Sequence, residues 1–228
     1  MHTLLSTLRV AAVSATLLLI GAPALHAKPP TKKQIDSALL TVSQEDMAPV
    51  KEAEDARHAG GQHEDQVSTE LANARLDQAA AKAWVDASKA VSKALEASQK
   101  AADAANRTAE LEDLAGRIAR ATKTGEWRDA RHEASKKAVA LQQLRLSWAK
   151  ADNQRLALAL ELVRLQVYAR AVAADVEAAV EGNAEAGRTQ TKLAKQERLT
   201  NKERGKVEDA ERALKDATLR AEALDPTN

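Results

Sequence analysis

The feature that most constrains the fold is a heptad pattern of apolar residues between Leu141 and Ala179. Twelve positions follow one another at alternating steps of three and four, and eleven of them are apolar. These positions are Leu141, Leu144, Trp148, Ala151, Arg155, Leu158, Leu162, Leu165, Ala169, Val172, Val176 and Ala179. A heptad pattern of this length is typical of coiled-coil packing. The pattern predicts a long helix that is covered by a partner helix along its length.

Part of this stretch, residues 156–180, is apolar enough to suggest a membrane span. It also contains five charged residues, which are Glu161, Arg164, Arg170, Asp175 and Glu177. Each ionised group at the centre of a bilayer costs several kcal/mol, so five of them exclude a span. A second apolar stripe lies beside the first and consists of Leu146, Leu156, Leu160, Val163 and Val167. Two stripes on one helix predict the central helix of a bundle, covered on two sides.

The composition agrees with long helices. The 228 residues include no Phe and no Cys, three Trp and one Tyr, while 29% are charged. A globular core usually draws on more aromatic area than this, whereas chains rich in Ala, Glu, Lys, Leu and Arg with helical periodicity form long helices or coiled coils. We therefore expect an all-α fold, an elongated antiparallel helical hairpin or coiled-coil bundle. The net charge of +1 gives no reason to expect nucleic acid as a partner.

The first 27 residues predict a signal peptide. Arg9 precedes an apolar run from Val10 to Ile20, which is shorter than the roughly 20 residues of a membrane span. Small residues follow, and cleavage is expected after Ala27 or, as a second choice, after Ala24. The chain would then be exported to the periplasm. Because there is no Cys, we expect neither a lipid anchor nor a disulfide.

The rest of the chain divides into two predicted parts. Residues 28–61 form a short helical segment with an amphipathic helix at 34–43, Pro49 early in the next helix, and a break at Gly60–Gly61. Residues 62–228 form a long hairpin followed by a C-terminal helix.

The expected helices of this second part are 62–122, 126–181 and 184–223, with a turn at Thr124–Gly125 and a break at 181–183. A tight turn between two long helices predicts an antiparallel pair. Leu162 is then expected opposite residues 83–90, where alanines leave room for larger side chains. The sequence leaves open whether the last helix folds back or continues its predecessor.

Charge is distributed unevenly along the chain. Residues 44–77 contain nine acids and three bases, a net charge of −6, whereas residues 186–206 contain seven bases and two acids, a net charge of +5. Both runs are interpreted first as solvated helix faces, which could attract one another. The alternative is a basic surface for an anionic envelope polymer or lipid head group. The residues of that surface would be Arg188, Lys192, Lys195, Arg198 and Lys202.

Residues that could carry chemistry are few. His58, His63, Glu64 and Asp65 surround the Gly–Gly pair, and imidazole with carboxylate can bind Zn or Cu. Their spacing matches no known metal signature, so we interpret them as surface residues and leave metal binding by His58 and His63 as an open alternative. No catalytic triad, phosphate loop or Cys nucleophile is present in the sequence. We expect no enzyme activity and no cofactor.

Residues 35–105 carry a family resemblance. The segments "APVKEAEDA" and "ELANARLDQAAAKAWVDASKAVSKALEA" resemble uncharacterised alanine-rich helical proteins of the bacterial envelope, which often occur as lipoproteins or ahead of OmpA-like domains. The resemblance covers about a third of the chain, which has neither the lipidation Cys nor an OmpA-like domain. It implies an envelope address and adds no mechanism.

These observations lead to one expected function and one alternative. The expected function is a non-enzymatic periplasmic scaffold or adaptor that presents coiled-coil faces to protein partners in the envelope, with self-association into a homo-oligomer compatible with such faces. The alternative is a periplasmic holdase-type chaperone or a metal-binding helical bundle. An apolar stripe left exposed after the hairpin has paired would favour the binding of a partner or client.

Overall fold

The computed structural model describes residues 29–227 and contains four α-helices. They are α1 (Lys32–Leu39), α2 (Gln44–Ala104), α3 (Thr108–Ala171) and α4 (Val176–Ala223). The three long helices have 61, 64 and 48 residues, so at 1.5 Å per residue they are about 92, 96 and 72 Å long. The predicted all-α class is confirmed. The predicted signal peptide, residues 1–27, lies outside the described residues.

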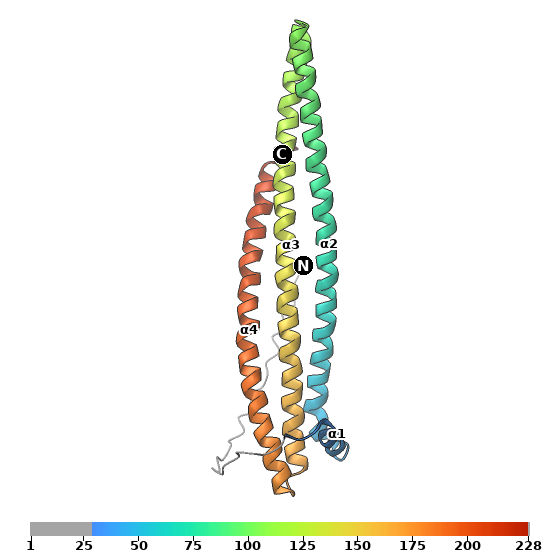
Figure 1. The fold of residues 1–228 in the computed structure, drawn as a ribbon, viewed down its shortest axis with the longest axis vertical. Helices are drawn as coiled ribbons and strands as arrows, with labels where there is room; N and C mark the ends of the chain where they lie inside the picture. Colours follow the sequence, from blue (N-terminus) through green and yellow to red (C-terminus); the bar gives the residue numbers. More distant parts are fainter. Residues whose placement is uncertain (1–28, 228) are drawn as a thin grey trace.

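The long helices form an elongated layer with α3 in the middle (Figure 1). α3 packs against α2 on one side and α4 on the other, while α2 and α4 make no extended contact with each other. The short helix α1 packs against α3 at the end of the layer where α2 begins. The central helix covered on two sides, predicted from the two apolar stripes, is therefore confirmed.

The hairpin turn between α2 and α3 is formed by residues 105–107, not by Thr124–Gly125. Asn106 has a φ of 54°, a left-handed conformation that Asn tolerates better than most residues. The Arg107 N–H donates to the Ala102 carbonyl and the Asn106 N–H to the Asp103 carbonyl, both at 3.0 Å. This is the Schellman pattern that ends many helices. The predicted turn was wrong because Thr124 lies inside α3, where its hydroxyl donates to the Arg120 carbonyl at 3.0 Å.

The predicted break at Gly60–Gly61 was also wrong, because α2 continues through both residues. A methyl group added at Gly60 would lie 2.6 Å from Leu156 Cδ1, so this glycine lets α2 and α3 approach closely. Two glycines in a helix cost about 1 kcal/mol each relative to Ala. Packing against α3 offsets that cost, so residues 44–61 belong to the long helix α2, whereas α1 remains a separate short helix.

The break predicted at 181–183 lies instead at residues 172–175, and α4 folds back along α3. Asp175 caps α4 by accepting a hydrogen bond from the Ala178 N–H at 3.1 Å. Gly182 is buried inside α4, where an added methyl group would lie 3.0 Å from Tyr168 Cδ1 and 3.2 Å from Ala169 Cβ. Like Gly60, this glycine marks a close helix contact and not a helix end.

These turns change the register of the hairpin. Arg128 donates to the Ser88 hydroxyl at 2.7 Å, and Asn153 donates to Glu64 at 3.0 Å. Leu162 therefore does not lie opposite residues 83–90 as predicted. It belongs to the same stripe as Ala151 and Ala169, which contact α4, and its side chain is half-buried.

The heptad stripe of α3 thus has a different partner from the one predicted, residues 62–122. Within α3 the heptad stripe faces α4 at Ala151 and Ala169, although its Trp148 also contacts His63 of α2. The second stripe, with Leu156, Leu160 and Val167, faces α2. The last three predicted heptad positions, Val172, Val176 and Ala179, lie in the turn and in α4. At the base, Val50 of α2 and Leu39 of α1 pack with Leu160 and Val167. A second cluster near the hairpin turn contains Leu95, Ala102 and Leu114, with Leu111, Ile118 and Ala121 packed against it.

Candidate interaction surfaces

The contact of α4 with α3 determines which face of α4 is free. Twelve positions of α4 at alternating steps of four and three are buried or half-buried. They are Gly182, Ala186, Thr189, Leu193, Gln196, Thr200, Glu203, Val207, Ala210, Leu214, Ala217 and Ala221. This seam was missed in the sequence because its members are mostly small or polar. Its spacing is a regular heptad pattern, which is the signal that could have revealed it.

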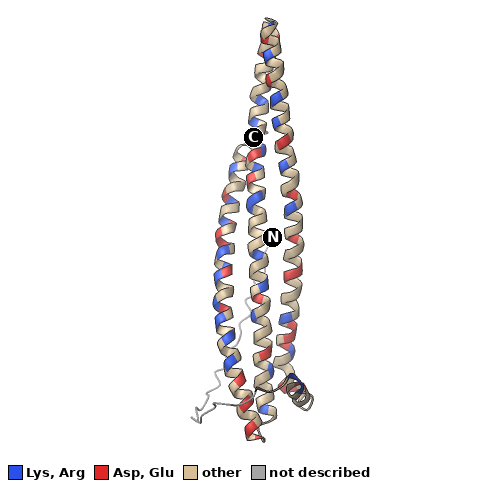
Figure 2. Ribbon diagram, in the orientation of Figure 1, with Lys and Arg blue, Asp and Glu red and all other residues tan. Residues whose placement is uncertain are grey.

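The five cations predicted to form a basic surface lie outside this seam, and all five are exposed. Arg188, Lys195 and Lys202 are seven residues apart, so they repeat about every 10.5 Å along one side of the helix. Lys192 and Arg198 lie between them. Figure 2 shows this concentration of Lys and Arg towards the middle of α4, above the acidic residues at its base. We call these five residues the basic stripe.

Part of the basic stripe is neutralised within α4. Glu185 lies 3.1 Å from Arg188 and 3.9 Å from Lys192, measured between charged atoms. Lys195, Arg198 and Lys202 have no carboxylate within 4.0 Å among residues 29–227. The stripe therefore presents three unpaired cations to solvent.

The acidic run lies on the opposite edge of the layer, on the lower half of α2. Within it, Glu54 lies 3.9 Å from Arg164 of α3, and Glu64 accepts from Asn153. Glu52, Asp55 and Asp65 are exposed and have no cation within 4.0 Å in the described part of the chain. We call these three residues the acidic edge.

The two charged runs do not neutralise each other within one chain. α3 stands between them, and no ion pair joins α2 to α4 in residues 29–227. Arg155, the one charged position of the heptad stripe, pairs with Asp152 of its own helix at 2.7 Å. The fold therefore separates a basic edge from an acidic edge.

Two of the three tryptophans gather around one arginine near the end of α4. The Arg131 guanidinium carbon lies 5.5 Å from the Trp84 ring centroid and 5.1 Å from that of Trp127, distances that allow cation–π attraction. Trp84 is 49% exposed. Hydrogen bonds from Thr227 lower the pKa of Asp225 below its usual value, and the nearby charge of Arg131 contributes to this effect. The C-terminal end of α4 therefore lies beside this cluster.

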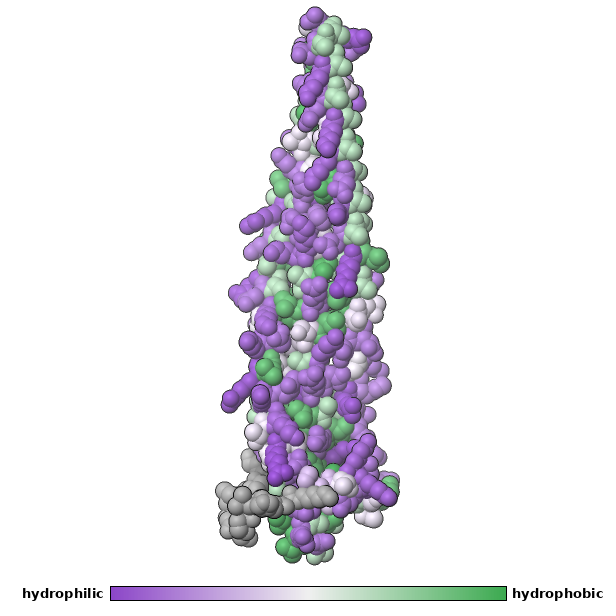
Figure 3. Space-filling model, in the orientation of Figure 1, coloured by the Kyte–Doolittle hydropathy of each residue, from purple (hydrophilic) through white to green (hydrophobic). Residues whose placement is uncertain are grey.

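Beyond the C-terminal end of α4, α2 and α3 continue as a pair, and the hairpin tip projects as a two-helix coiled coil (Figure 1). The outer face of α2 carries nine exposed apolar residues at heptad spacing. They are Leu76, Ala80, Ala83, Ala87, Ala90, Ala94, Ala97, Ala101 and Ala104. Figure 3 shows a pale green column along the α2 side of the tip. The exposed apolar stripe considered from the sequence is therefore present on α2.

His58, His63 and His132, the histidines among the described residues, do not belong to a metal site of three or more ligands. Within residues 29–227 no group of three His, Cys, Asp or Glu residues is arranged to hold a metal ion. His58 is hydrogen-bonded to Gln62 at 3.0 Å. His63 instead contacts Trp148 edge-on, with ring centroids 5.8 Å apart. The two imidazoles therefore have separate neighbours.

Tyr168 is a buried ionisable group whose pKa is raised. Burial raises the pKa of its hydroxyl above 10.0, and the carboxylates of Glu181 and Asp175 act in the same direction. Its ring packs over Gly182, so its role is to join α3 to α4.

None of the helices in residues 29–227 combines the length and apolar character needed to cross a membrane. No protein family, curated protein or solved structure matches this chain.

Proposed function

We propose that this chain is a non-enzymatic helical scaffold or adaptor of the periplasm, which presents its uncovered helix faces to protein partners. The observation that carries the proposal is the three-helix layer itself. α4 covers only one side of α3 and ends below the hairpin turn, so both outer edges and the tip stay accessible (Figure 1). A closed bundle would bury these faces in its own core.

The accessible faces differ in chemistry, which supports recognition of different partners. Residues 186–206 of α4 are basic, the lower half of α2 is acidic, and the upper half of α2 carries the exposed apolar stripe. Exposed apolar surface of this extent marks interaction sites more often than isolated apolar residues do. The stripe would accept a partner helix, because alanine side chains allow close approach.

Site-specific photocrosslinking in cells tests the proposal. A photoreactive residue at Ala90 or Lys195 would report on the outer faces of α2 and α4, and one at Leu141, which is only 4% exposed, serves as the buried control. We expect discrete crosslinked products with other proteins from the outer positions and none from Leu141. Equal crosslinking from all three positions, or none from the outer ones, would contradict a scaffold.

The predicted export is tested separately. Mass spectrometry of the protein recovered from the periplasm should show a chain that begins at Lys28 or, as the second choice, at Leu25. An exported chain that retains Met1 would contradict the signal peptide, and retention of the protein in the cytoplasm would contradict the proposed location.

A holdase-type chaperone is the second candidate, favoured by the large apolar residues exposed on α2. Leu76, Trp84 and Val91 are 69%, 49% and 52% exposed. A holdase would suppress the aggregation of an unfolded test protein, and Leu76→Ser together with Val91→Ser would reduce that effect. A scaffold would instead crosslink to the same few partners whether or not unfolded protein accumulates.

A further inference from the structure

The outer edges of the layer run in the same direction. α3 is antiparallel to α2 through the turn at 105–107 and antiparallel to α4 through the turn at 172–175. α2 and α4 are therefore parallel to each other, and both run from the base towards the hairpin tip. A second copy placed beside the first in the same orientation would bring its α2 alongside the first copy's α4.

The acidic edge and the basic stripe also lie at the same height along the layer. On one side of α3, Glu64 bonds to Asn153 at 3.0 Å. On the other side, Gln196 bonds to Gln154 at 3.3 Å and to the Ala151 carbonyl at 2.9 Å. Residues 64 and 196 thus flank the same turn of α3. Because α2 and α4 are parallel, the rest of the acidic edge falls level with the rest of the basic stripe.

We infer that the basic stripe on α4 of one copy docks against the acidic edge on α2 of a second copy in the same orientation. This inference rests on the proposed scaffold function and names a partner for one of its faces. Asp65 of the second copy would lie near Arg198 and Lys202, and Glu52 and Asp55 near Arg188. All six side chains are exposed in the single chain.

Charge also selects the orientation of the second copy. Only the lower half of α2 is acidic, since residues 78–104 contain four lysines and three acids, a net charge of +1. A copy turned end over end would place this weakly basic half beside the basic stripe. Juxtaposed like charges disfavour that arrangement, and complementary patches fix the register of the correct one. Individual exposed ion pairs contribute little, so the association depends on several of them acting together.

The use of two different edges determines the form of the assembly. Each copy uses two different surfaces, so the contact is heterologous and further copies add in the same direction. The product is an open array or, if the rotation between neighbours closes, a ring. The hairpin tips of all copies would then project from one side, which suits a scaffold that displays repeated binding faces.

Charge reversal on each edge tests the inference with the full mature chain. The α4 variant carries Lys195→Glu, Arg198→Glu and Lys202→Glu. The α2 variant carries Glu52→Lys, Asp55→Lys and Asp65→Lys. A control with the same change in net charge as the α4 variant carries Lys93→Glu, Lys100→Glu and Lys123→Glu, which are exposed positions of the tip. Circular dichroism establishes that each variant is folded, and sedimentation velocity measures its association.

We expect the parent and the control to associate at about 0.01 M salt and to dissociate at about 1 M, where the screening length falls to about 3 Å. Each edge variant alone should be monomeric, because both of its edges then carry the same sign. An equimolar mixture of the two variants should associate again, since the acidic edge of one meets the basic edge of the other. A monomeric parent at low salt, or a mixture that stays monomeric, would overturn the inference.

An anionic envelope polymer or lipid head group, the alternative partner expected for the basic stripe from the sequence, predicts a different result. The α2 variant would then bind vesicles that contain anionic lipid, or peptidoglycan, as well as the parent does. Only the α4 variant would lose binding, and the parent would remain monomeric without the polymer. That outcome overturns docking of a second copy but leaves the scaffold proposal intact if partner crosslinks from Ala90 persist.

Discussion

The two sides of α3 show two ways of holding a helix in place. On the side of α2, branched apolar side chains meet one another, as Val50 meets Leu160 and Val167. On the side of α4, large residues of α3 meet small or polar residues, as Tyr168 meets Gly182. The first contact resembles an ordinary hydrophobic core, whereas the second depends on close approach and hydrogen bonds.

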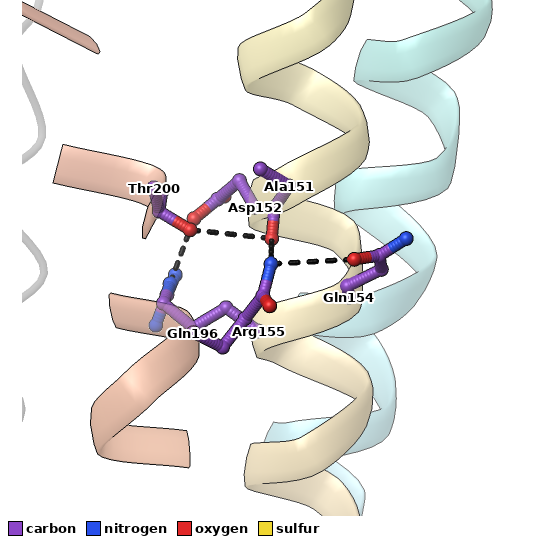
Figure 4. Close-up of polar contacts among 6 residues, drawn as sticks. All are labelled: Ala151, Asp152, Gln154, Arg155, Gln196 and Thr200. Atoms are coloured by element: carbon purple, nitrogen blue, oxygen red, sulfur yellow. Dashed lines mark hydrogen bonds and ion pairs between the residues drawn. The ribbon is translucent and has the colours of Figure 1, made fainter. Parts of the chain in front are cut away.

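Hydrogen bonds across the α3–α4 contact fix its register. Gln196 and Thr200 both donate to the Ala151 carbonyl, at 2.9 and 3.2 Å (Figure 4). The ion pair of Arg155 with Asp152 lies beside them. At the far end of the contact, Arg145 bonds to Glu211 at 2.7 Å. A contact with little branched apolar surface gains its specificity from such directional bonds, because sliding one turn would leave the partly buried polar groups unpaired.

The largest expected effect compares one leucine on each side of α3. Leu160 faces α2 and is 6% exposed, and Leu165, on the heptad stripe, is 1% exposed. Leu160→Ala and Leu165→Ala should each lower the free energy of unfolding by about 2–5 kcal/mol, because each leaves a cavity. Chemical denaturation followed by circular dichroism measures both. A loss at Leu160 with no loss at Leu165 would mean that α4 does not cover the heptad stripe.

A smaller loss is expected where α3 and α4 approach most closely. Gly182→Leu would force a side chain against Tyr168 and Ala169 and should destabilise the protein by about 1–3 kcal/mol. Gly187→Leu is the matched control on the same helix, since a methyl group added at Gly187 meets nothing within 4 Å. The control should gain up to about 1 kcal/mol from better helix propensity. Equal denaturation midpoints for the two variants would contradict the close contact.

Two threonines of the α4 seam should respond to the same substitution with opposite signs. Thr189 is 0% exposed and its hydroxyl has no hydrogen-bond partner among residues 29–227, so Thr189→Val should stabilise the protein by about 1 kcal/mol. Thr200→Val removes the bond to Ala151 and should destabilise it by a similar amount, about 1 kcal/mol. Thermal unfolding of both variants provides the comparison, and a shift in the same direction for both would refute this difference between the two positions.

The smallest effect concerns the adjacent glycines of α2. Gly61 has open space around it, so Gly61→Ala should stabilise α2 by up to about 1 kcal/mol. Gly60→Ala would bring its methyl group against Leu156, which must move, and should gain less or become unfavourable. If both substitutions stabilise equally, Gly60 does not mark the close approach of α2 and α3.

Much of this fold follows from local pattern. The alternating steps of three and four between Leu141 and Ala179 predicted a long helix with covered sides, and the structure has that helix as far as Ala171. The caps were not predicted, although their residue types are typical, since Ser43 and Asp175 are common N-cap residues and Asn106 is a residue that tolerates a left-handed turn. The hairpin turn was predicted at Thr124–Gly125 and not at Asn106, which displaced every predicted facing pair of residues between the two long helices.

The basic stripe was also predictable from the sequence only in part. Sequence alone placed Arg188, Lys192, Lys195, Arg198 and Lys202 together, because residues three, four and seven apart share a helix face. It could not show that three of these cations lack a carboxylate, or that the acidic run of α2 lies across the layer at the same height. Those facts depend on the register between helices and on their order in space.

The sequence by itself thus determined that this chain forms long helices and which stripes of each helix are apolar, because both properties repeat with the period of one helix. Only the tertiary structure decided which stripe meets which partner. The small residues of α2 and of α4 both complement the large residues of α3, so side-chain volume did not discriminate between them. The turn geometry at Asn106 and the close contacts at Gly60 and Gly182 determine the pairing, because they set the distance and the register between the helices.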